Sequence, residues 1–558
     1  MLHAQDKPVI VQSDKTLLLE VHAQEFAQAR DDIAPFSELI KSPEHFHTYR
    51  LTPLSLWNAS SAGITCEKVI SRLNRWSKYP VPQSIEHFIR DTASRYGMLY
   101  LSEGPDGQTL CLNCTSDLLY QQLLHYPVLK KLLTPVGGRV FHLHLLHRGQ
   151  IKIHLIKLGY PVEDLVPLSK GAHHPITLRS VTASGREFSL RDYQYEAVQA
   201  FLGQQQPSPG LGYGTVVMPC GSGKTVIGIG IMERLKTQTL IITTNTAAVH
   251  QWIDELLDKT TVAESDIGEY TGARKEMRPI TVCTYQILTW RPDRESDFPH
   301  FKLVTEHDWG LIIYDEVHLL PAPVFKVTSE IQAVMRLGMT ATLVREDHRE
   351  DEVFSLIGPK RYDIPWKELE QKGWIAEAVC TEIRLPLPEH LEIPYAVAGR
   401  AEKFRIASEN PNKKTAVAQI IENHQEDHIL VIGQYIRQLK ELAEVLHAPL
   451  ITGKVANAKR EELYAQFRKG DIHVLVVSKV ANFAIDLPDA SVAIQVSGTF
   501  GSRQEEAQRL GRILRPKKRN AHFYNLVTRF TSEEQFAANR QHFLTEQGYQ
   551  YQMEMWDG

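Results

Sequence analysis

The feature that most constrains the fold of this chain is the stretch from residue 214 to residue 225, which reads GTVVMPCGSGKT. The β-branched run at 215–218 predicts a buried strand, and the apolar stretch 226–235 predicts a helix. Between them lies a loop of small residues that includes Gly221 and Gly223. A strand, a glycine loop and a helix in this order are the context of a phosphate-binding loop, because backbone amides and the helix N-terminus both attract anions.

The residues that end this loop predict how a nucleotide is held. Lys224 is placed to reach the β- and γ-phosphates, and Thr225 is placed to ligate Mg²⁺ through its hydroxyl. The general pattern has glycine six residues before the lysine, where this chain has Met218. The glycines at 221 and 223 alone form the reduced pattern that many helicase-type motors use. The alternative is an ordinary glycine turn before a helix, and the acidic pair described below disfavours it.

The chain is too long for one hydrophobic core, and its charge excludes a generally basic surface. Its 558 residues predict three or four domains. The net charge of −4 means that contacts with nucleic acid come from local patches. There is no N-terminal signal and no apolar run long enough for a membrane span. We therefore expect a soluble, cytoplasmic protein that has no contact with a membrane.

The cysteine pattern favours a reducing compartment over a metal site. The six cysteines are mostly scattered, as in proteins that keep free thiols. Cys111 and Cys114 have metal-like spacing, and His142 and His144 alternate onto one face of an expected strand. A single pair of cysteines is weak evidence for zinc, so packed thiols are the favoured interpretation.

A pair of carboxylates follows the apolar run at 311–314 in the sequence LIIYDEVH. Asp315 is expected to hold Mg²⁺ through water, and Glu316 to orient or deprotonate the attacking water. Adjacent carboxylates at a strand end also occur in solvated turns, but a phosphate loop in the same chain favours the catalytic interpretation. Strands expected at 240–244 and 282–285 end in polar residues where a ligand crevice would lie.

Residues 190–194, which read LRDYQ, begin the region that carries the phosphate loop and the acidic pair. The Gln194 amide can pair with adenine by accepting from the N6 amine and donating to N7, although a helix cap explains it equally well. A second α/β run begins near residue 428 and contains strands expected at 429–432 and 474–477. It ends in a helix where Arg509, Arg512 and Arg515 recur every three residues. The alternative, a solvated basic face, is disfavoured because the first lobe lacks its own transition-state arginine.

Together these motifs resemble superfamily 2 helicases, and within them the XPB family of DNA repair and transcription helicases. The family markers are the Asp-Glu-Val-His box, the Thr-Ala-Thr at 340–342 followed by Arg345-Glu-Asp, and the sequence QRLGRILR at 508–515. The stretches 410–413, 478–480, 486–488 and 540–548 also resemble XPB members. The resemblance is strong from about 188 to 550. This chain departs from many superfamily members in the FAID sequence at 483–486, and from general helicases at Leu514, a leucine that XPB relatives share.

The resemblance implies a role for each matching residue. Adenine contacts fall to Arg191 and Gln194, and Asp486 is a ribose or metal-water contact. Arg512 and Arg515 are implied arginine fingers, with Gln508 beside the attacking water. The ATP phosphates are assigned to Gly221, Ser222, Gly223 and Lys224, and Mg²⁺ to Thr225 and Asp315. DNA contact, with help in opening the duplex, is assigned to Arg345, Glu346 and Asp347.

The expected fold is α/β, with two RecA-like parallel-sheet lobes after an N-terminal domain and a small α+β domain. The expected divisions are an accessory domain at 1–125, a small damage-recognition-like domain at 126–186, lobe 1 at 187–358 and lobe 2 at 359–558. A thumb-like insertion is expected at about 366–412. Four basic residues lie in this range or just beyond it: Lys403, Arg405, Lys413 and Lys414. They are candidates to contact the DNA backbone, although a solvated surface explains them equally well.

These observations predict an ATP-driven DNA motor that moves 3′→5′ in DNA repair of the nucleotide excision type. Contacts to the phosphate backbone suit a motor because they are independent of base sequence. Its partners would be duplex or forked DNA and a nuclease or repair factor. Two alternatives stay open: an RNA-directed helicase, and a DNA-binding scaffold whose ATPase times the release of DNA or a partner nuclease.

Overall fold

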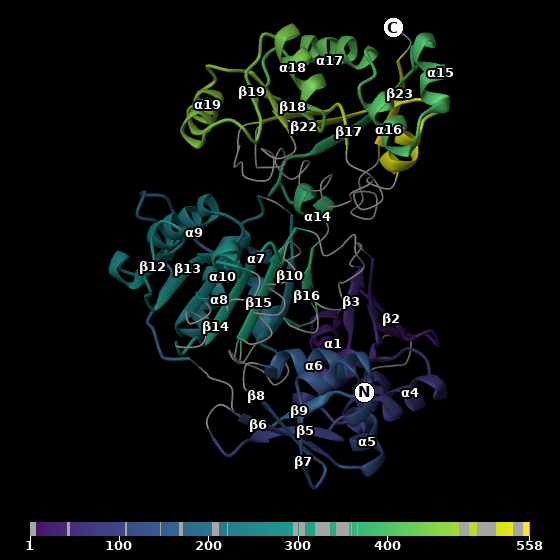
Figure 1. Cartoon of the computed structure of the whole chain (residues 1–558), viewed down its shortest axis with the longest axis vertical. Coiled ribbons are helices and arrows are strands. Elements are labelled where there is room, and N and C mark those ends of the chain that lie inside the picture. The colour runs from purple at the N-terminus through teal and green to yellow at the C-terminus, as the bar shows by residue number, and fades with distance from the viewer. Residues whose placement is uncertain are drawn as a thin grey trace. The chain divides into compact units, whose positions relative to one another are not determined.

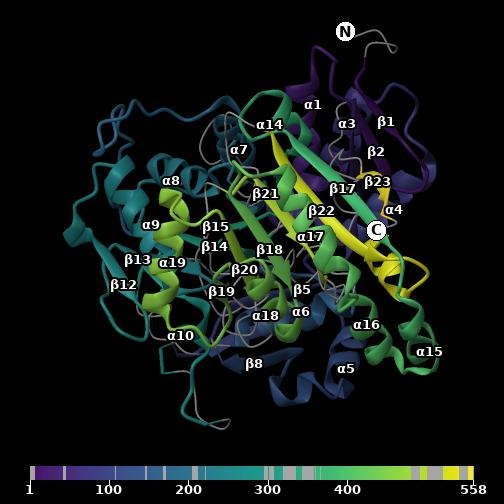
Figure 2. The ribbon, with the colours of Figure 1, turned by 90° about the horizontal axis from the view of Figure 1, so that it is seen from above.

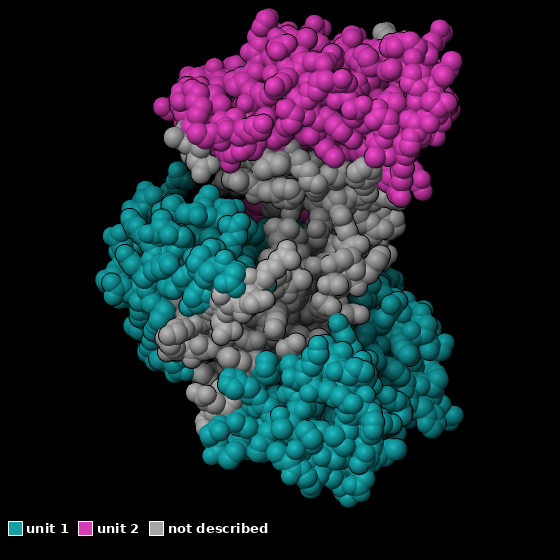
Figure 3. Space-filling view, in the orientation of Figure 1, with its two compact units in different colours: residues 1–217, 223–343, 349–363 teal, residues 218–222, 344–348, 364–558 magenta. Residues whose placement is uncertain are grey.

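The structure is a computed structural model of the whole chain. The chain divides into two compact units (Figure 3): residues 1–217, 223–343 and 349–363 form unit 1, and residues 218–222, 344–348 and 364–558 form unit 2. The residues that the structure describes are 7–41, 45–106, 109–144, 147–166, 171–203, 211–219, 221–293, 299–300, 307–317, 335–341, 357–358, 360–364, 366–478, 490–498, 520–538 and 551–556.

The first domain of unit 1 is an antiparallel sheet packed against helices. Its described strands are ordered β1 (Val9–Val11), β2 (Thr16–Glu20), β4 (Phe46–Arg50) and β3 (Glu38–Lys41). The helices are α1 (Phe26–Ile33), α2 (Pro53–Ser61), α3 (Cys66–Trp76) and α4 (Gln83–Ser94). The core runs from Val9 to Ile89, and α3 buries one face through Val69, Leu73 and Trp76. This core ends before residue 95.

The second domain has a mixed sheet, described in the order β7 (Thr134–Gly137), β8 (Val140–His144), β6 (Thr109–Cys114), β5 (Leu99–Glu103) and β9 (Val162–Asp164). Helices α5 (Asp117–His125) and α6 (Arg148–Lys157) share its core. Strand pairing between β6 and β8 crosses residue 125. The domain boundary expected there therefore moves to the stretch between α4 and β5, because these strands cannot be divided without breaking their sheet.

Lobe 1 is built on a parallel sheet, in which the helices after β10 and β11 return the chain to the same edge. Its described strands have the order β12 (Ile267–Tyr270), β13 (Ile280–Thr284), β11 (Thr239–Thr243), β14 (Leu311–Asp315), β15 (Met335–Thr340), β10 (Tyr213–Val217) and β16 (Lys360–Asp363). Helices α7 (Asp192–Leu202), α8 (Lys224–Leu235) and α9 (Thr246–Lys259) pack in a row, and the short α10 (Tyr285–Thr289) follows β13 (Figure 1). The strands and helices around the phosphate loop were thus predicted correctly.

β16 joins the first domain to lobe 1. It pairs with β10, so lobe 1 extends beyond the expected boundary at 358. The Arg361 guanidinium is buried and donates through Nε to the Tyr213 carbonyl oxygen (3.0 Å) and through Nη1 to the Ala34 carbonyl oxygen (3.1 Å). Lys360 Nζ donates to the Ile40 carbonyl oxygen at 3.1 Å. One strand therefore holds both the first domain and the strand that leads into the phosphate loop.

Lobe 2 has a second parallel sheet, seen from above in Figure 2. Where it is described, its order is β19 (Leu450–Ile451), β20 (Val474–Ser478), β18 (Ile429–Gly433), β21 (Val492–Gln495), β22 (Ala521–Thr528), β17 (Ala378–Leu385) and β23 (Tyr551–Met555). Its described helices are α14 (Trp366–Gln371), α15 (Glu389–Val397), α16 (Arg400–Ser408), α17 (Asn412–Asn423), α18 (Ile436–Val445) and α19 (Asn457–Lys469). The fold class is confirmed.

The expected thumb-like insertion at 366–412 is not a single insertion in this fold. β17 lies inside that range and pairs along its whole length with β22, so it is a strand of the lobe 2 sheet. The sequence AVCTEIRL of β17 is mostly buried, which is what a strand covered on both faces requires. The helices of the range, α15 and α16, pack on each other, and α16 is also tied to β22, since the Thr528 hydroxyl donates to the Ala407 carbonyl oxygen at 2.7 Å.

In the part of the chain that the structure describes, no helix combines the length and the apolar character needed to cross a membrane. The longest of these helices is α9, with 14 residues.

Candidate nucleotide site

The phosphate loop leaves the carboxyl end of β10 and enters α8 through two glycines with left-handed backbone. Gly221 has φ +79° and Gly223, the residue that caps α8, has φ +83°. The left-handed φ of Gly223 favours glycine, and a Cβ atom there would lie 2.5 Å from the Gln194 side-chain nitrogen, so that amide would have to shift. Met218, which replaces the expected glycine, is buried. The departure at Met218 thus places an apolar side chain in the core and leaves the glycine turn intact.

Gln194 lies against this loop from the first turn of α7. Its Oε1 accepts a hydrogen bond from the Arg191 backbone N–H (3.0 Å), and its own N–H donates to the Arg191 carbonyl oxygen (2.9 Å). The side chain is buried, and Arg191 Nη1 donates to the Tyr193 hydroxyl at 3.0 Å. Gln194 therefore caps the start of α7, as the helix-cap interpretation expected. The adenine role of Arg191 and Gln194 stays a prediction.

Asp315 is the last residue of β14 and is held by three neighbours. Its Oδ2 accepts a hydrogen bond from Trp252 Nε1 on α9 (3.0 Å), and its Oδ1 accepts one from the Glu316 N–H (3.0 Å). The Tyr285 hydroxyl donates to the Asp315 carbonyl oxygen at 2.9 Å. These contacts fix the carboxylate at the carboxyl edge of the sheet.

Glu316 meets Lys224 across the site. Lys224 Nζ lies 3.3 Å from Glu316 Oε1, although the two residues are far apart in sequence and come from α8 and the end of β14. Glu316 has backbone φ +49°, a left-handed conformation that is uncommon for a residue with a Cβ and is often found at functional sites. The parallel sheet thus brings together three of the predicted residues, Lys224, Asp315 and Glu316. Thr225 follows Lys224 in the first turn of α8.

The electrostatics of the pair favour a cation. Burial and the neighbouring Glu316 charge raise the pKa of Asp315 to about 6, against the lowering effect of the Trp252 hydrogen bond and the Lys224 charge. Two carboxylates this close repel each other, so a divalent ion would be attracted to the site. A loop with left-handed glycines at 221 and 223, a lysine and two carboxylates together fit a nucleotide phosphate with its metal ion.

Two supporting residues were missed by sequence reasoning. Tyr285 ends the strand expected at 282–285 and Trp252 lies in the segment after the strand expected at 240–244, but nothing in the sequence pattern shows that both donate hydrogen bonds to Asp315. A tryptophan and a tyrosine buried beside an acidic strand end are the signal that could have found them, since a buried N–H or O–H requires an acceptor.

Several predicted residues lie outside the described residues. These are Gln508, Arg512, Arg515, Asp486, Arg345, Glu346 and Asp347.

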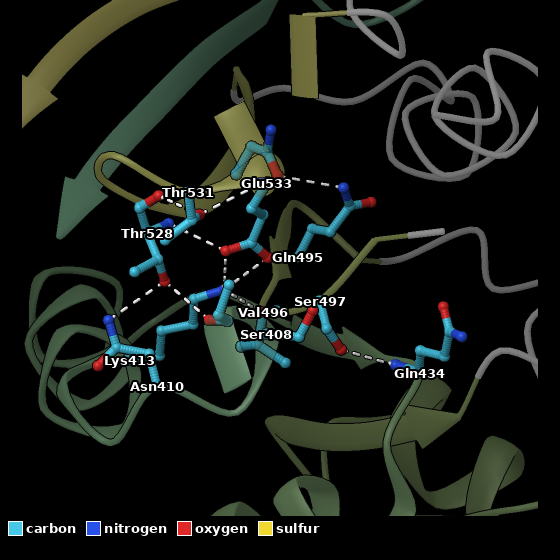
Figure 4. A network of polar contacts seen from close by, with 12 residues as sticks. Ser408, Asn410, Lys413, Gln434, Gln495, Val496, Ser497, Thr528, Thr531 and Glu533 are labelled. Carbon is cyan, nitrogen blue, oxygen red and sulfur yellow. Dashed lines mark hydrogen bonds and ion pairs between the residues drawn. The ribbon is translucent and has the colours of Figure 1, made fainter. Parts of the chain in front are cut away.

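Lys413 is not an exposed DNA contact, and this prediction is wrong. Its Nζ is buried at the carboxyl edge of lobe 2, 2.8 Å from Glu533 Oε1, and it also donates to the Val496 carbonyl oxygen at 2.9 Å (Figure 4). The Thr528 N–H donates to the same Glu533 carboxylate at 2.9 Å. Asn410 Nδ2 completes the network through the Thr528 hydroxyl at 3.2 Å. The network joins the N-terminus of α17 to the ends of β21 and β22.

The other three basic residues predicted with Lys413 have different surroundings. Lys414 forms an ion pair with Glu441. Lys403 Nζ lies 5.6 Å from the centre of the Tyr395 ring, and Arg405 pairs with the exposed Glu402 at 2.6 Å. DNA contacts by these three residues stay a prediction.

The suggested zinc site does not form. Cys111 and Cys114 are three residues apart on β6, so their side chains face opposite sides of the sheet. Cys114 belongs to the apolar core, whereas Cys111 lies opposite His142 in the register. Within the described ranges, no group of three or more His, Cys, Asp or Glu side chains is placed to hold a metal.

The parallel sheet of lobe 1, with a glycine loop at one strand end and paired carboxylates at another, defines a P-loop nucleoside triphosphatase. Comparison with known proteins then narrows the class. Residues 369–555 match the family described as ERCC3/RAD25/XPB C-terminal helicase. Residues 187–345 match the type III restriction enzyme res subunit family, and residues 9–136 match a helicase conserved C-terminal domain.

Full-length relatives agree with these matches. The chain is 49% identical over 551 residues to the DNA 3′-5′ helicase XPB of Kineococcus radiotolerans, which covers 98% of this chain and 96% of the relative. It is 48% identical to the DNA 3′-5′ helicase XPB of Mycobacterium tuberculosis, with 98% and 97% covered. It is 32% identical to the general transcription and DNA repair factor IIH helicase/translocase subunit XPB of Enterocytozoon bieneusi, with 98% and 93% covered. The chain belongs to the XPB family of helicases.

Proposed function

We propose that this protein is an ATP-dependent DNA 3′-5′ helicase or translocase of the XPB type that acts in DNA repair of the nucleotide excision type. The observation that carries the proposal is the convergence of Lys224, Asp315 and Glu316 at one edge of the lobe 1 sheet. Relatives named DNA 3′-5′ helicase XPB, which match nearly the whole chain, support DNA as the substrate.

The site residues fit ATP with Mg²⁺. The backbone amides from Gly221 to Gly223, with Ser222 between them, would surround the phosphates, and Lys224 would exchange its Glu316 partner for the β- and γ-phosphates. Thr225 and Asp315 would hold the metal ion, which neutralises charge on the phosphate oxygens. The Trp252 and Tyr285 hydrogen bonds keep Asp315 in position for this role.

Glu316 is the proposed base. In this structure its carboxylate pairs with Lys224, so each side chain helps to hold the other at the site. When phosphate takes over the lysine, Glu316 would be left facing the γ-phosphate position, where it can orient a water or accept its proton. Through this exchange of partners, phosphate binding would free the Glu316 carboxylate to act as the base.

The second lobe would complete the reaction. Arg512 and Arg515 are proposed to meet the charge that builds on the γ-phosphate, Gln508 to contact the water, and Asp486 to contact ribose or a metal-bound water. Arginine fingers in other motors contribute roughly 10³–10⁵ in kcat. Arg345, Glu346 and Asp347 are proposed to contact DNA and help to open it, and Arg191 and Gln194 to contact adenine. The family match across residues 369–555 supports this assignment for lobe 2.

ATP turnover should be measured with duplex DNA, forked DNA, single-stranded DNA and RNA, each with a strand-separation readout. We expect stimulation by DNA that exceeds stimulation by RNA, and loss of turnover in Lys224→Ala. Glu316→Gln should still bind ATP but hydrolyse it roughly 10²–10⁴ times more slowly. Glu264→Gln, an exposed carboxylate of the same lobe, is the matched control.

The alternatives give different results in this experiment. RNA stimulation without DNA stimulation indicates an RNA-directed helicase. DNA-stimulated turnover with neither strand separation nor movement on duplex indicates a scaffold that times release of DNA or of a partner nuclease. Normal turnover in Glu316→Gln would contradict its role as the base.

A further inference from the structure

An exposed aromatic and cationic patch lies on lobe 1 at the opposite end of the sheet from the phosphate loop. The strand order places β12 and β13 at one end of the sheet, with β13 four strand spacings, or about 19 Å, from β10. The patch follows the carboxyl ends of β12 and β13, so it lies on the same edge of the sheet as the nucleotide site. The nucleotide mechanism uses none of its residues.

The aromatic part of the patch is Trp290, which directly follows α10. About half of this residue (52%) is exposed to solvent. The ring centres of Trp290 and the buried His300 lie 5.7 Å apart. The ring centres of His300 and Tyr270 are also 5.7 Å apart. The Tyr270 hydroxyl and His300 Nδ1 are hydrogen-bonded at 3.1 Å. The indole is therefore supported by neighbouring rings while much of its own surface stays open.

The imidazole next to Trp290 is neutral at ordinary pH. Burial lowers the pKa of His300, and the neighbouring Lys275 charge lowers it further. Lys275 Nζ lies 3.5 Å from His300 Nε2. A neutral ring adds no positive charge directly beside the indole, so the charge of the patch resides in the turn that carries Lys275.

That turn carries two adjacent exposed cations, Arg274 and Lys275, followed by Glu276, in a chain whose net charge is −4. Arg274 Nη1 lies 4.0 Å from the Glu269 carboxylate, so Lys275 is the cation closest to the rings. The Thr271 N–H donates to the Arg274 carbonyl oxygen at 2.7 Å, and the Glu276 N–H donates to the Glu269 carbonyl oxygen at 2.9 Å. The turn therefore presents its basic side chains from a fixed backbone.

We propose that Trp290 stacks on an unpaired base of the DNA strand while Lys275 and Arg274 contact the neighbouring phosphates. An exposed indole alone would suit a protein partner equally well. Lys275, whose amine contacts the same His300 ring as Trp290, and the exposed Arg274 next to it in the chain favour a polyanion that also has flat aromatic groups. Stacking does not depend on base identity, so it allows a motor to hold any sequence. This inference rests on the proposed DNA-motor function and adds a specific base contact.

Binding of the full-length protein to two fluorescein-labelled probes tests the proposal. One probe is a thymidine oligonucleotide, and the other has the same sugar-phosphate backbone without bases. We expect Trp290→Ala to weaken binding of the thymidine probe by roughly 5- to 150-fold, which corresponds to about 1–3 kcal/mol for stacking. Binding of the abasic probe should change by less than about twofold. Trp290→Phe, which keeps a π face, should recover most of the affinity for the thymidine probe.

A matched variant and a charge variant sharpen the result. Tyr195→Ala removes another exposed aromatic ring of lobe 1, on α7, and should leave binding of both probes unchanged. Lys275→Gln should weaken both probes equally and reduce the slope of log affinity against log salt by about 1.

Equal affinity of wild type and Trp290→Ala for the thymidine probe would overturn the proposal. An equal loss on both probes would also overturn it, because a base contact cannot act on an abasic strand. Failure of the wild type to bind either probe or duplex DNA would instead contradict the proposed function, so the two failures are distinguishable.

Discussion

At the scale of single residues, the nucleotide site depends on how Asp315 is held. Its carboxylate is buried and lies beside a second carboxylate, an arrangement that opposes ionisation. The indole N–H of Trp252 and the backbone N–H of Glu316 both donate to it and stabilise the charged form. Trp252 therefore does more than fill the core: it keeps Asp315 closer to the ionised state that a metal ion requires.

This argument predicts a change in pH dependence for Trp252→Phe. Removing the donor removes an interaction that lowers the pKa of Asp315, so the pKa rises above its value of about 6. Since Mg²⁺ binding needs the carboxylate, the acidic limb of kcat/KM should move to higher pH, and more Mg²⁺ should be needed at pH 6.5. A pH profile of DNA-stimulated ATP hydrolysis measures this shift. Trp309→Phe, at another buried tryptophan of the same lobe, is the control.

At the scale of elements, lobe 2 contains a buried ion pair where a free DNA contact was expected. Lys413 and Glu533 are each almost fully buried, and their partners are the ends of β21 and β22. Removing one member of such a pair leaves the other charge uncompensated in a poorly polar interior. The network in Figure 4 therefore matters for how α17 is joined to the sheet.

Lys413→Met should destabilise lobe 2 by about 3–5 kcal/mol, because the Glu533 carboxylate is left buried without its partner. Hydrogen exchange of peptides from α17 and β22 in the full-length protein would report faster local opening. The double variant Lys413→Met/Glu533→Gln should recover much of the loss, since no buried charge remains. Lys414→Met, in the more exposed pair with Glu441, should change stability by less than about 1 kcal/mol. Comparable effects of the two single variants would contradict this account.

The same elements show which features of the fold and the site the sequence could predict. The phosphate loop, the strand before Asp315 and the strands at 429 and 474 were predictable, because each has a local signature of β-branched residues or glycines. The position of β17 was not, since its strand character depends on pairing with β22, far along the chain. The burial of Lys413 was equally hidden, because its partner Glu533 is 120 residues away. The contacts of Asp315 with Trp252 and Tyr285 are also long-range pairs.

At the scale of the whole molecule, unit 1 carries a pH-sensitive contact in its first domain. His47 on β4 packs edge-on against the Phe26 ring, with ring centres 5.2 Å apart. Burial lowers its pKa to about 4, the Asp363 charge raises it, and the Arg30 and Lys360 charges lower it. The folded protein therefore favours the neutral imidazole.

Stability should fall as the pH drops from about 6.5 towards 4, because the unfolded chain takes up a proton on His47 that the folded chain excludes. Urea midpoints of the full-length protein at pH 7 and pH 5 measure this fall. In His47→Gln, which cannot titrate, the difference between the two midpoints should be smaller. His87→Gln, at an exposed histidine of α4, should keep the wild-type difference; an identical fall in all three proteins would contradict the prediction.

The Arg361 bridge has a consequence for how this protein can diverge. Both of its acceptors, at Tyr213 and Ala34, are backbone carbonyl oxygens, which every amino acid supplies. Drift in the identity of residue 34 would leave its hydrogen bond available, whereas Tyr213 also contacts Arg361 through its ring, 5.1 Å away. Residue 361 has no such freedom, since a lysine amine lacks the planar guanidinium that reaches both oxygens at once. The junction between the first domain and the motor is thus asymmetric in its tolerance: position 34 in the first domain can accept substitutions, while position 361 in the motor is restricted to arginine.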